Sequence, residues 1–293
     1  MNTKNILSIV ISYNDIKNTS ITVESLLNQT VETKIVVWDN NSKDQTPQTL
    51  KKLFGDRIIV HQSSENAYWA PAINAAFSKY YEGEQILHYS NNDIYYPNES
   101  LERMIRDLIE TDAGAVGSTG GAMGGAQDHI FHNPEDNSKI DLITDFYKSI
   151  KSRPPTRASS LVGACMVMKT KTWKFMGPLD NGMPLGADDF DFSIRVRLMG
   201  LPLYVCQSGY IYHVGHASGY NNKSTWSEIG AQSWAWFNKK WDGFYFNELE
   251  AAKCLWNHEY NHNWDYGTGW MDEESRIKVW HKRGVNYDGS PIH

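Results

Sequence analysis

The chain has few cysteines, no long apolar run and no excess of positive charge among its 293 residues. Its three cysteines, Cys165, Cys206 and Cys254, are scattered without a CxxC spacing, which disfavours a disulfide framework or a zinc site and is typical of reduced thiols in a cytosolic protein. Every apolar run is much shorter than the ~20 residues that span a bilayer. A net charge of -6 gives no general basic surface for nucleic acid. Because the first residues lead into a strand-like run and contain no signal-peptide cleavage site, we expect a cytoplasmic protein, free or peripheral at the membrane.

The two common glycine-rich phosphate-binding motifs are also absent. Neither GxxxxGK[ST] nor a strand-coupled GxGxxG is present, so P-loop and dinucleotide sites have no fingerprint here. A diphosphate could instead be held by a divalent cation, Mg²⁺ or Mn²⁺, for which the carboxylate of Asp93 is a suitable ligand. His213 or His216 would be a second ligand, although an HxxH pair is by itself more often a hydrogen-bonded surface pair.

Short apolar runs alternate with helical patterns over the first 110 residues. The expected strands lie at residues 6–11, 34–38, 57–61 and 85–89, and the expected helices at residues 20–28, 47–54, 70–81 and 99–110. This alternation predicts an open, mostly parallel α/β sheet flanked by helices. Further strands are expected at residues 161–168 and 202–206.

The alternation breaks at Gly117, and the following residues are rich in Gly, Asp, Asn and Pro. We therefore expect a variable insertion of loops at residues 117–160, with one helix near 142–150. The main domain is expected to cover residues 1–218. Helical patterns at 226–241 and 273–282 predict that residues 219–293 form an aromatic-rich C-terminal helical extension.

The run at residues 187–197 places three carboxylates beside bulky apolar residues. Its apolar residues alternate as in a strand, but acids at its start, arginines near its end and a glycine beyond it predict a helix buried on most sides. Asp188 and Asp189 would lie at the helix N-terminus, and Asp191 would pair with Arg195 one turn on. Adjacent acids at the edge of a core repel each other and lose hydration, so a chemical role explains them better than a folding role.

Three polar clusters follow expected strands: Ser12–Asp15, Asp39–Ser42 and Ser90–Asp93. Each cluster alone is equally well explained by turn formation. In open α/β sheets, however, ligands bind beyond the carboxyl ends of the strands. Three clusters at one edge of one sheet therefore predict a ligand cleft.

The polar clusters, the acidic run at 187–197 and several further segments given below follow one another in an order that resembles family 2 of the inverting glycosyltransferases, which have the GT-A fold. Among that family, the bacterial rhamnosyltransferase-like members are the most similar. The resemblance extends from Ile6 to about Ser218. The segments that carry it are Val10–Asn14 at the opening strand, Val36–Asp44 ("VVDNNSxD"), Glu65–Asn66 with Ala70–Phe77 ("ENxGFAxxxN"), Ser90–Asp93 at the DxD position, Gly163–Met166 ("GACM"), Asp188–Asp191 ("EDxD") and Tyr212–Ser218 ("HxxGxS").

The resemblance implies a metal-dependent, inverting glycosyltransferase that moves a sugar from a nucleotide-diphosphate sugar, such as a UDP- or dTDP-sugar, to an acceptor hydroxyl. Asp189 would be the general base, while Asp188 stands where the family usually has Glu. Asn91 replaces the first Asp of the DxD pattern, which shifts metal binding onto Asp93. The implied ligands of Mn²⁺ or Mg²⁺ are Asp93 and His213, and the implied nucleotide-binding residues are Ser12, Tyr13, Asp39, Asn41, Asn66 and Asn92.

Two other functions remain open at this point. A sugar-1-phosphate nucleotidyltransferase would share the architecture, but it would need a basic, glycine-rich signature that Ser12–Asp15 does not provide. A carbohydrate-binding protein on the same scaffold would not need both Asp93 and Asp189. The acceptor could be a glycan, a cell-surface polymer, a protein or a modified nucleic-acid base, and the donor sugar could be glucose, galactose or rhamnose.

Overall fold

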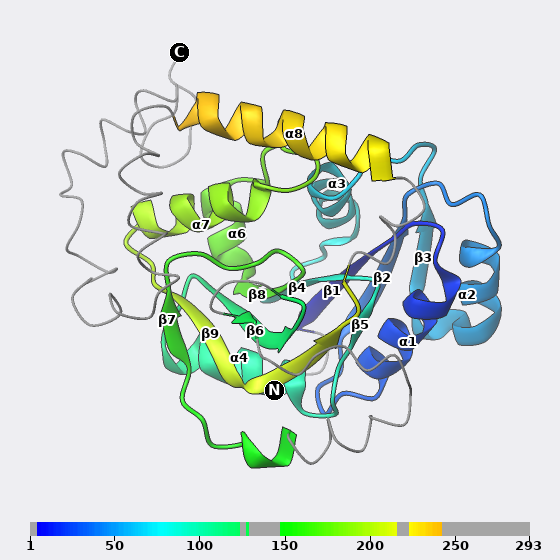
Figure 1. Cartoon of the computed structure of the whole chain (residues 1–293). Coiled ribbons are helices and arrows are strands. Elements are labelled where there is room, and N and C mark those ends of the chain that lie inside the picture. Colours follow the sequence, from blue (N-terminus) through cyan, green and yellow to red (C-terminus); the bar gives the residue numbers. More distant parts are fainter. Residues whose placement is uncertain (1–4, 124–126, 129–146, 216–222, 242–293) are drawn as a thin grey trace.

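The computed structural model describes residues 5–123, 127–128, 147–215 and 223–241 (Figure 1). Within them, one mixed sheet has the strand order β3-β2-β1-β4-β8-β6-β9-β5, with β7 beside β9. The strands are β1 (Ile6–Ser12), β2 (Lys34–Asp39), β3 (Ile59–Gln62), β4 (Ile86–Asn91), β5 (Ile94–Tyr95), β6 (Ala115–Gly121), β7 (Thr156–Ala158), β8 (Cys165–Lys169) and β9 (Leu203–His213). The longest ladders, β1–β2, β1–β4 and β6–β9, are parallel, whereas β8 runs antiparallel to β4 and β6. The predicted α/β architecture is confirmed.

Helices cover both faces of this sheet. They are α1 (Ile16–Leu27), α2 (Thr46–Phe54), α3 (Ala70–Tyr80), α4 (Ser100–Glu110), α6 (Thr170–Met176), α7 (Asp188–Leu198) and α8 (Lys223–Lys240). Because successive side chains of a strand point to opposite faces, Leu7 and Ile9 of β1 pack in a core with α3, α6, α7 and α8, while Ile6 and Val10 pack with α1, α2 and α4. Figure 1 shows α8 along the outside of the first of these helix layers. None of the described helices is both long and apolar enough to cross a membrane.

The sequence patterns were wrong at two places, residues 117–121 and the start of β8. The expectation of loops from Gly117 onward is wrong for residues 117–121, which continue β6 between β8 and β9. This strand is rich in glycine because its neighbours approach closely: a Cβ at Gly120 would lie 2.7 Å from the carbonyl oxygen of Ile211. Strand β8 begins at Cys165, later than expected. The domain boundaries stay predictions, and the expected helix at 273–282 lies outside the described residues.

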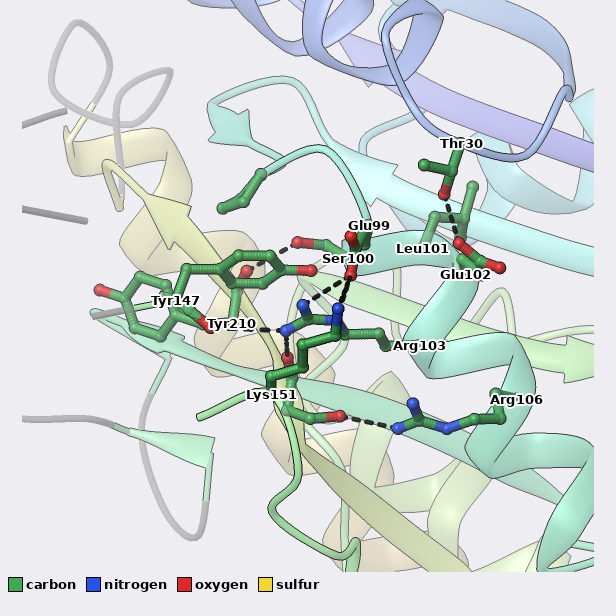
Figure 2. A network of polar contacts seen from close by, with 12 residues as sticks. Thr30, Glu99, Ser100, Leu101, Glu102, Arg103, Arg106, Tyr147, Lys151 and Tyr210 are labelled. Carbon is green, nitrogen blue, oxygen red and sulfur yellow. Dashed lines mark hydrogen bonds and ion pairs between the residues drawn. The ribbon is translucent and has the colours of Figure 1, made fainter. Parts of the chain in front are cut away.

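Arg103 of α4 connects the segment after residue 146 to the sheet (Figure 2). Its guanidinium lies 3.9 Å from the ring centroid of Tyr147 and donates to the carbonyl of Ser208 on β9 at 2.7 Å. It also pairs with Glu99 one turn earlier, at 2.7 Å. The three contacts satisfy a cation that is almost fully buried, which would otherwise be costly to desolvate.

Asp191 connects α7 to α8. Its carboxylate is fully buried and accepts hydrogen bonds from Arg195 Nε at 2.8 Å and from Trp241 Nε1 at 3.1 Å. Lys240 Nζ lies 2.7 Å from Oδ1 of Asp191, the oxygen that also accepts from Trp241, and it contacts Asp180 as well. The predicted pairing of Asp191 with Arg195 is confirmed, and the structure adds two partners from the end of α8.

Replacing Asp191 by Ala should lower the free energy of unfolding by about 3–5 kcal/mol, because Arg195 and Lys240 would lose the buried charge that compensates them. Urea denaturation measures this change. The control is Asp112→Asn, which removes an ion pair with Lys169 from a side chain that is 82% exposed and should change stability by less than ~1 kcal/mol. Equal effects of the two substitutions would contradict the prediction.

Candidate active site

A cavity of about 330 Å³ lies beyond the carboxyl ends of β1 and β4. Its wall includes the ends of these strands, the end of β9, the start of α7 and the first turn of α8. A second hollow, of about 580 Å³, lies at the amino ends of β2 and β4, around Lys34, Glu82 and Glu84. It contains none of the predicted site residues. The first cavity is therefore the candidate active site.

The structure brings most of the predicted site residues into this one wall. Those that line the cavity are Ser12, Tyr13, Asn66, Asn92, Asp93, Asp188, Asp189 and His213. Thr19 of α1 helps to position two of them, because its hydroxyl lies 2.9 Å from Ser12 Oγ and accepts from Asn92 Nδ2 at 2.9 Å. His216 lies outside the described residues.

Asp39 and Asn41 do not line the cavity. The Asp39 carboxylate is fully buried and accepts from the backbone N–H of Ser42 at 2.9 Å and from its hydroxyl at 2.5 Å. Burial raises the pKa of Asp39, although the hydrogen bonds from Ser42 oppose this shift. Asn41 donates to the carbonyl of Ser64 at 2.7 Å. Asn40, between them, is the residue of this cluster that reaches the wall, so nucleotide binding by Asp39 and Asn41 stays a prediction.

Asp93 and His213 form the candidate metal site. His213 Nδ1 lies 3.1 Å from the carbonyl oxygen of Ala122; a carbonyl only accepts, so we assign the proton of the neutral ring to Nδ1 and the lone pair to Nε2. Nε2 lies 3.2 Å from Asp93 Oδ1. Burial lowers the pKa of His213, but the hydrogen bond and charge of Asp93 outweigh it, so this pKa is raised.

The donor set fits a divalent cation. The lone pair of Nε2, to which Asn91 Nδ2 can donate at 3.1 Å, lies beside the Asp93 carboxylate oxygen, and nitrogen and oxygen are suitable ligands for such an ion. Within the described parts of the chain, no group of three or more His, Cys, Asp or Glu side chains could hold a metal ion. Asp93 and His213 would therefore bind the cation together with oxygen atoms of a bound ligand.

Asp188 and Asp189 lie at the N-terminus of α7, which follows Ala187 in a left-handed conformation (φ 64°). Two backbone N–H groups orient the Asp189 carboxylate, that of Gly163 at 3.0 Å and that of Phe190 at 2.9 Å. Burial raises the pKa of Asp189, and these two hydrogen bonds oppose the shift. Burial, and next the charge of Asp189, raise the pKa of Asp188 well above its usual value. Of the pair, Asp189 therefore ionises first.

Sequence reasoning missed three aromatic residues of the wall, Tyr68, Trp69 and Trp226. Tyr68 has a φ of 64°, which is rare for a bulky side chain and costs about 1–3 kcal/mol. Its N–H donates to Asn66 Oδ1 at 2.9 Å and its carbonyl accepts from Asn40 Nδ2 at 2.5 Å, so two other wall residues hold the strained turn. One signal was available: the "ENxGFAxxxN" pattern has glycine where this chain has Tyr68.

Several solved structures have a similar fold. A mannosyltransferase from Pyrobaculum calidifontis, in complex with GDP-Man and Mn²⁺, is 17% identical, with a TM-score of 0.61 over 95% of this chain and 74% of that chain. GalNAc-T7 with UDP, GalNAc and Mn²⁺ is 13% identical, with a TM-score of 0.58 over 86% of this chain and 55% of that one. TarS from S. aureus is 17% identical, with a TM-score of 0.51 over 82% of this chain and 44% of that one. The chain thus spans about half the length of the last two, and at these identities the likeness shows the fold alone.

This fold, with carboxylates at the strand ends of one cavity, is the GT-A fold. The model of the family described as "Glycosyl transferase family 2" matches residues 8–173, which is more than half of the chain, and the chain belongs to this family. No curated protein sequence matches this chain. This membership favours a glycosyltransferase over the nucleotidyltransferase and the binding protein that the sequence left open.

Replacing Tyr68 by Gly should raise the Tm by about 2–4 °C, because relief of the strain outweighs the greater freedom of glycine in the unfolded chain. The same substitution should weaken binding of UDP or dTDP about tenfold, since loss of an aromatic surface for a base costs roughly 1–3 kcal/mol. Thermal unfolding and calorimetry measure the two effects.

The matched control is Asp112→Gly, which removes another left-handed residue (φ 49°) that is absent from the cavity wall. It should leave nucleotide affinity unchanged. A lower Tm for Tyr68→Gly would show that the turn at Tyr68 is not strained. An unchanged nucleotide affinity would show that Tyr68 does not serve the ligand.

Proposed function

We propose that this chain is a divalent-metal-dependent, inverting glycosyltransferase that uses a UDP- or dTDP-sugar and an acceptor hydroxyl. One observation carries the proposal: the oriented carboxylate of Asp189 and the facing pair Asp93 and His213 line the same cavity. Buried free thiols at Cys165 and Cys206 suit a reducing compartment such as the cytoplasm.

In the proposed reaction, the Asp189 carboxylate takes the proton of the acceptor hydroxyl. The acceptor oxygen attacks the anomeric carbon on the face opposite the diphosphate, and the bond between that carbon and the diphosphate oxygen breaks with its electron pair leaving on the diphosphate. When bound at Asp93 and His213, a divalent cation would stabilise the charge that grows on the departing diphosphate. Asp188 stays protonated beside the base, so the pair carries one negative charge rather than two.

Asp189→Asn should lower kcat by about 10²–10⁴-fold while donor still binds, because an amide cannot accept the proton. The kcat of Asp188→Asn should stay within about tenfold of that of the original chain, because Asn resembles the protonated, neutral acid that we propose for Asp188. Steady-state transfer assays with nucleotide-sugar donors, dTDP-rhamnose included, measure both. If Asp189→Asn kept its activity, or if the two variants were equally impaired, the base assignment would be wrong.

The pH dependence follows from the raised pKa of Asp189. The base must be ionised, so kcat/KM should fall as the pH is lowered through that pKa, at a pH above the usual value of an aspartate. Asp188→Asn should leave this acid limb in place, since Asp188 is uncharged over the same range. A pH profile of both proteins tests this, and a limb that moves with Asp188→Asn would reverse the assignment of the proton.

Chelation by EDTA should abolish donor turnover, and Mn²⁺ or Mg²⁺ should restore it in the original chain. The metal should not restore turnover in Asp93→Ala, because the cation loses one of its two proposed protein ligands. A titration of Mn²⁺ against donor hydrolysis, with thermal-shift measurements of UDP binding in parallel, distinguishes loss of metal from loss of fold. Full activity of Asp93→Ala without metal would remove Asp93 from the site.

A further inference from the structure

We propose that Trp69 and Trp226 form the acceptor subsite and that the group they receive is a neutral sugar ring. The proposal rests on the proposed function, because it takes Asp189 as the group beside the reacting hydroxyl. The donor nucleotide is expected at the end of β1, so the wall around Asp189 remains for the acceptor.

Trp69 lies beside the proposed base. Its indole Nε1 is 3.6 Å from the position that a Cβ of Gly163 would occupy, and Asp189 Oδ2 is 3.7 Å from the same point. The indole packs edge-on against Tyr89 of the core, with the ring centroids 6.1 Å apart. The backbone N–H of Trp69 donates to the carbonyl of Pro184 at 2.8 Å. Trp69 is therefore a half-buried aromatic surface held in place next to the carboxylate.

Trp226 reaches the same wall from α8. This helix is fixed to the segment that leads into α7, because Ser233 Oγ accepts from the N–H of Leu185 at 3.3 Å, and Gly230 passes close to the Leu185 carbonyl. Trp226 lies one turn before Gly230 and lines the cavity together with Leu185. By contrast, Trp234 of the same helix packs on Phe190 and does not line the cavity.

The charge and the surface of the wall indicate what the two indoles receive. Asp93 and Asp189 bring negative charge to the cavity, and none of its lining residues within the described chain is Lys or Arg. At Asp93 and His213 the proposed cation would offset the diphosphate of the donor, but no described lining residue offers a second cation beside Asp189, so an acceptor that carries phosphate would be repelled there. A neutral pyranose has an apolar C–H face for an indole and hydroxyl groups for the polar side chains, and aromatic walls with few polar groups are typical of such small-molecule sites.

The test is binding of neutral methyl glycosides of hexoses, deoxyhexoses and N-acetylhexosamines, compared with methyl hexoside 6-phosphates, by saturation-transfer NMR in the presence of UDP and Mg²⁺. We expect at least one neutral glycoside to bind, and to bind at least tenfold more weakly to Trp226→Ala and Trp69→Ala. The Phe variants of both residues should recover most of the affinity, and UDP affinity should be unchanged in every variant. The matched control is Trp236→Ala, on the same helix and 45% exposed, which should bind as the original chain does.

Failure of the two proposals can be distinguished. If the original chain turns over no nucleotide sugar with Mn²⁺, the proposed function fails, whatever the variants do. If it turns over a donor but binds no neutral glycoside, the subsite proposal alone is wrong. Tighter binding of a methyl hexoside 6-phosphate, or Ala variants that bind glycosides like the original chain, would overturn it equally.

Discussion

The position of the site depends on one buried carboxylate, that of Asp191. Its partners come from α7 itself and from the end of α8. Because α7 carries Asp188 and Asp189 at its N-terminus and α8 carries Trp226, this single group fixes two walls of the cavity relative to each other. A buried charge with several hydrogen-bonding partners is costly to disrupt, so the two helices form one unit.

The cavity also concentrates acidic side chains, and burial changes pKa values within it. Asp93, Asp188 and Asp189 are the acidic residues of its described lining, and burial together with the charge of Asp189 raises the pKa of Asp188. Burial lowers the pKa of His213, but the hydrogen bond and charge of Asp93 raise it overall. Under the proposed function the same two groups hold a cation, so protons and metal should compete for them.

Much of the fold could be predicted from the sequence, because end signals are local. The helix α7 illustrates this: acids, arginines and a following glycine defined it although its apolar residues alternate as in a strand. That alternation arises because α7 is buried on most sides, and its polar residues, such as Ser193 and Arg195, are buried as well. Strand β6 was missed because its glycines are required by the close approach of a strand far along the chain, as at Gly120 beside Ile211. Trp69 and Trp226 were missed for the same reason: an aromatic residue in a sequence looks like core until the opposite wall is known.

The contacts of Asp191 also have a consequence for the order in which the chain folds. The strands β1 to β4 pair with one another and all precede residue 92, so this half of the sheet can assemble early during synthesis. The helix with the proposed base gains Lys240 and Trp241 as partners only once residue 241 has left the ribosome. The half of the cavity formed by the ends of β1 and β4 is thus built first, and the half that carries the proposed base is completed last.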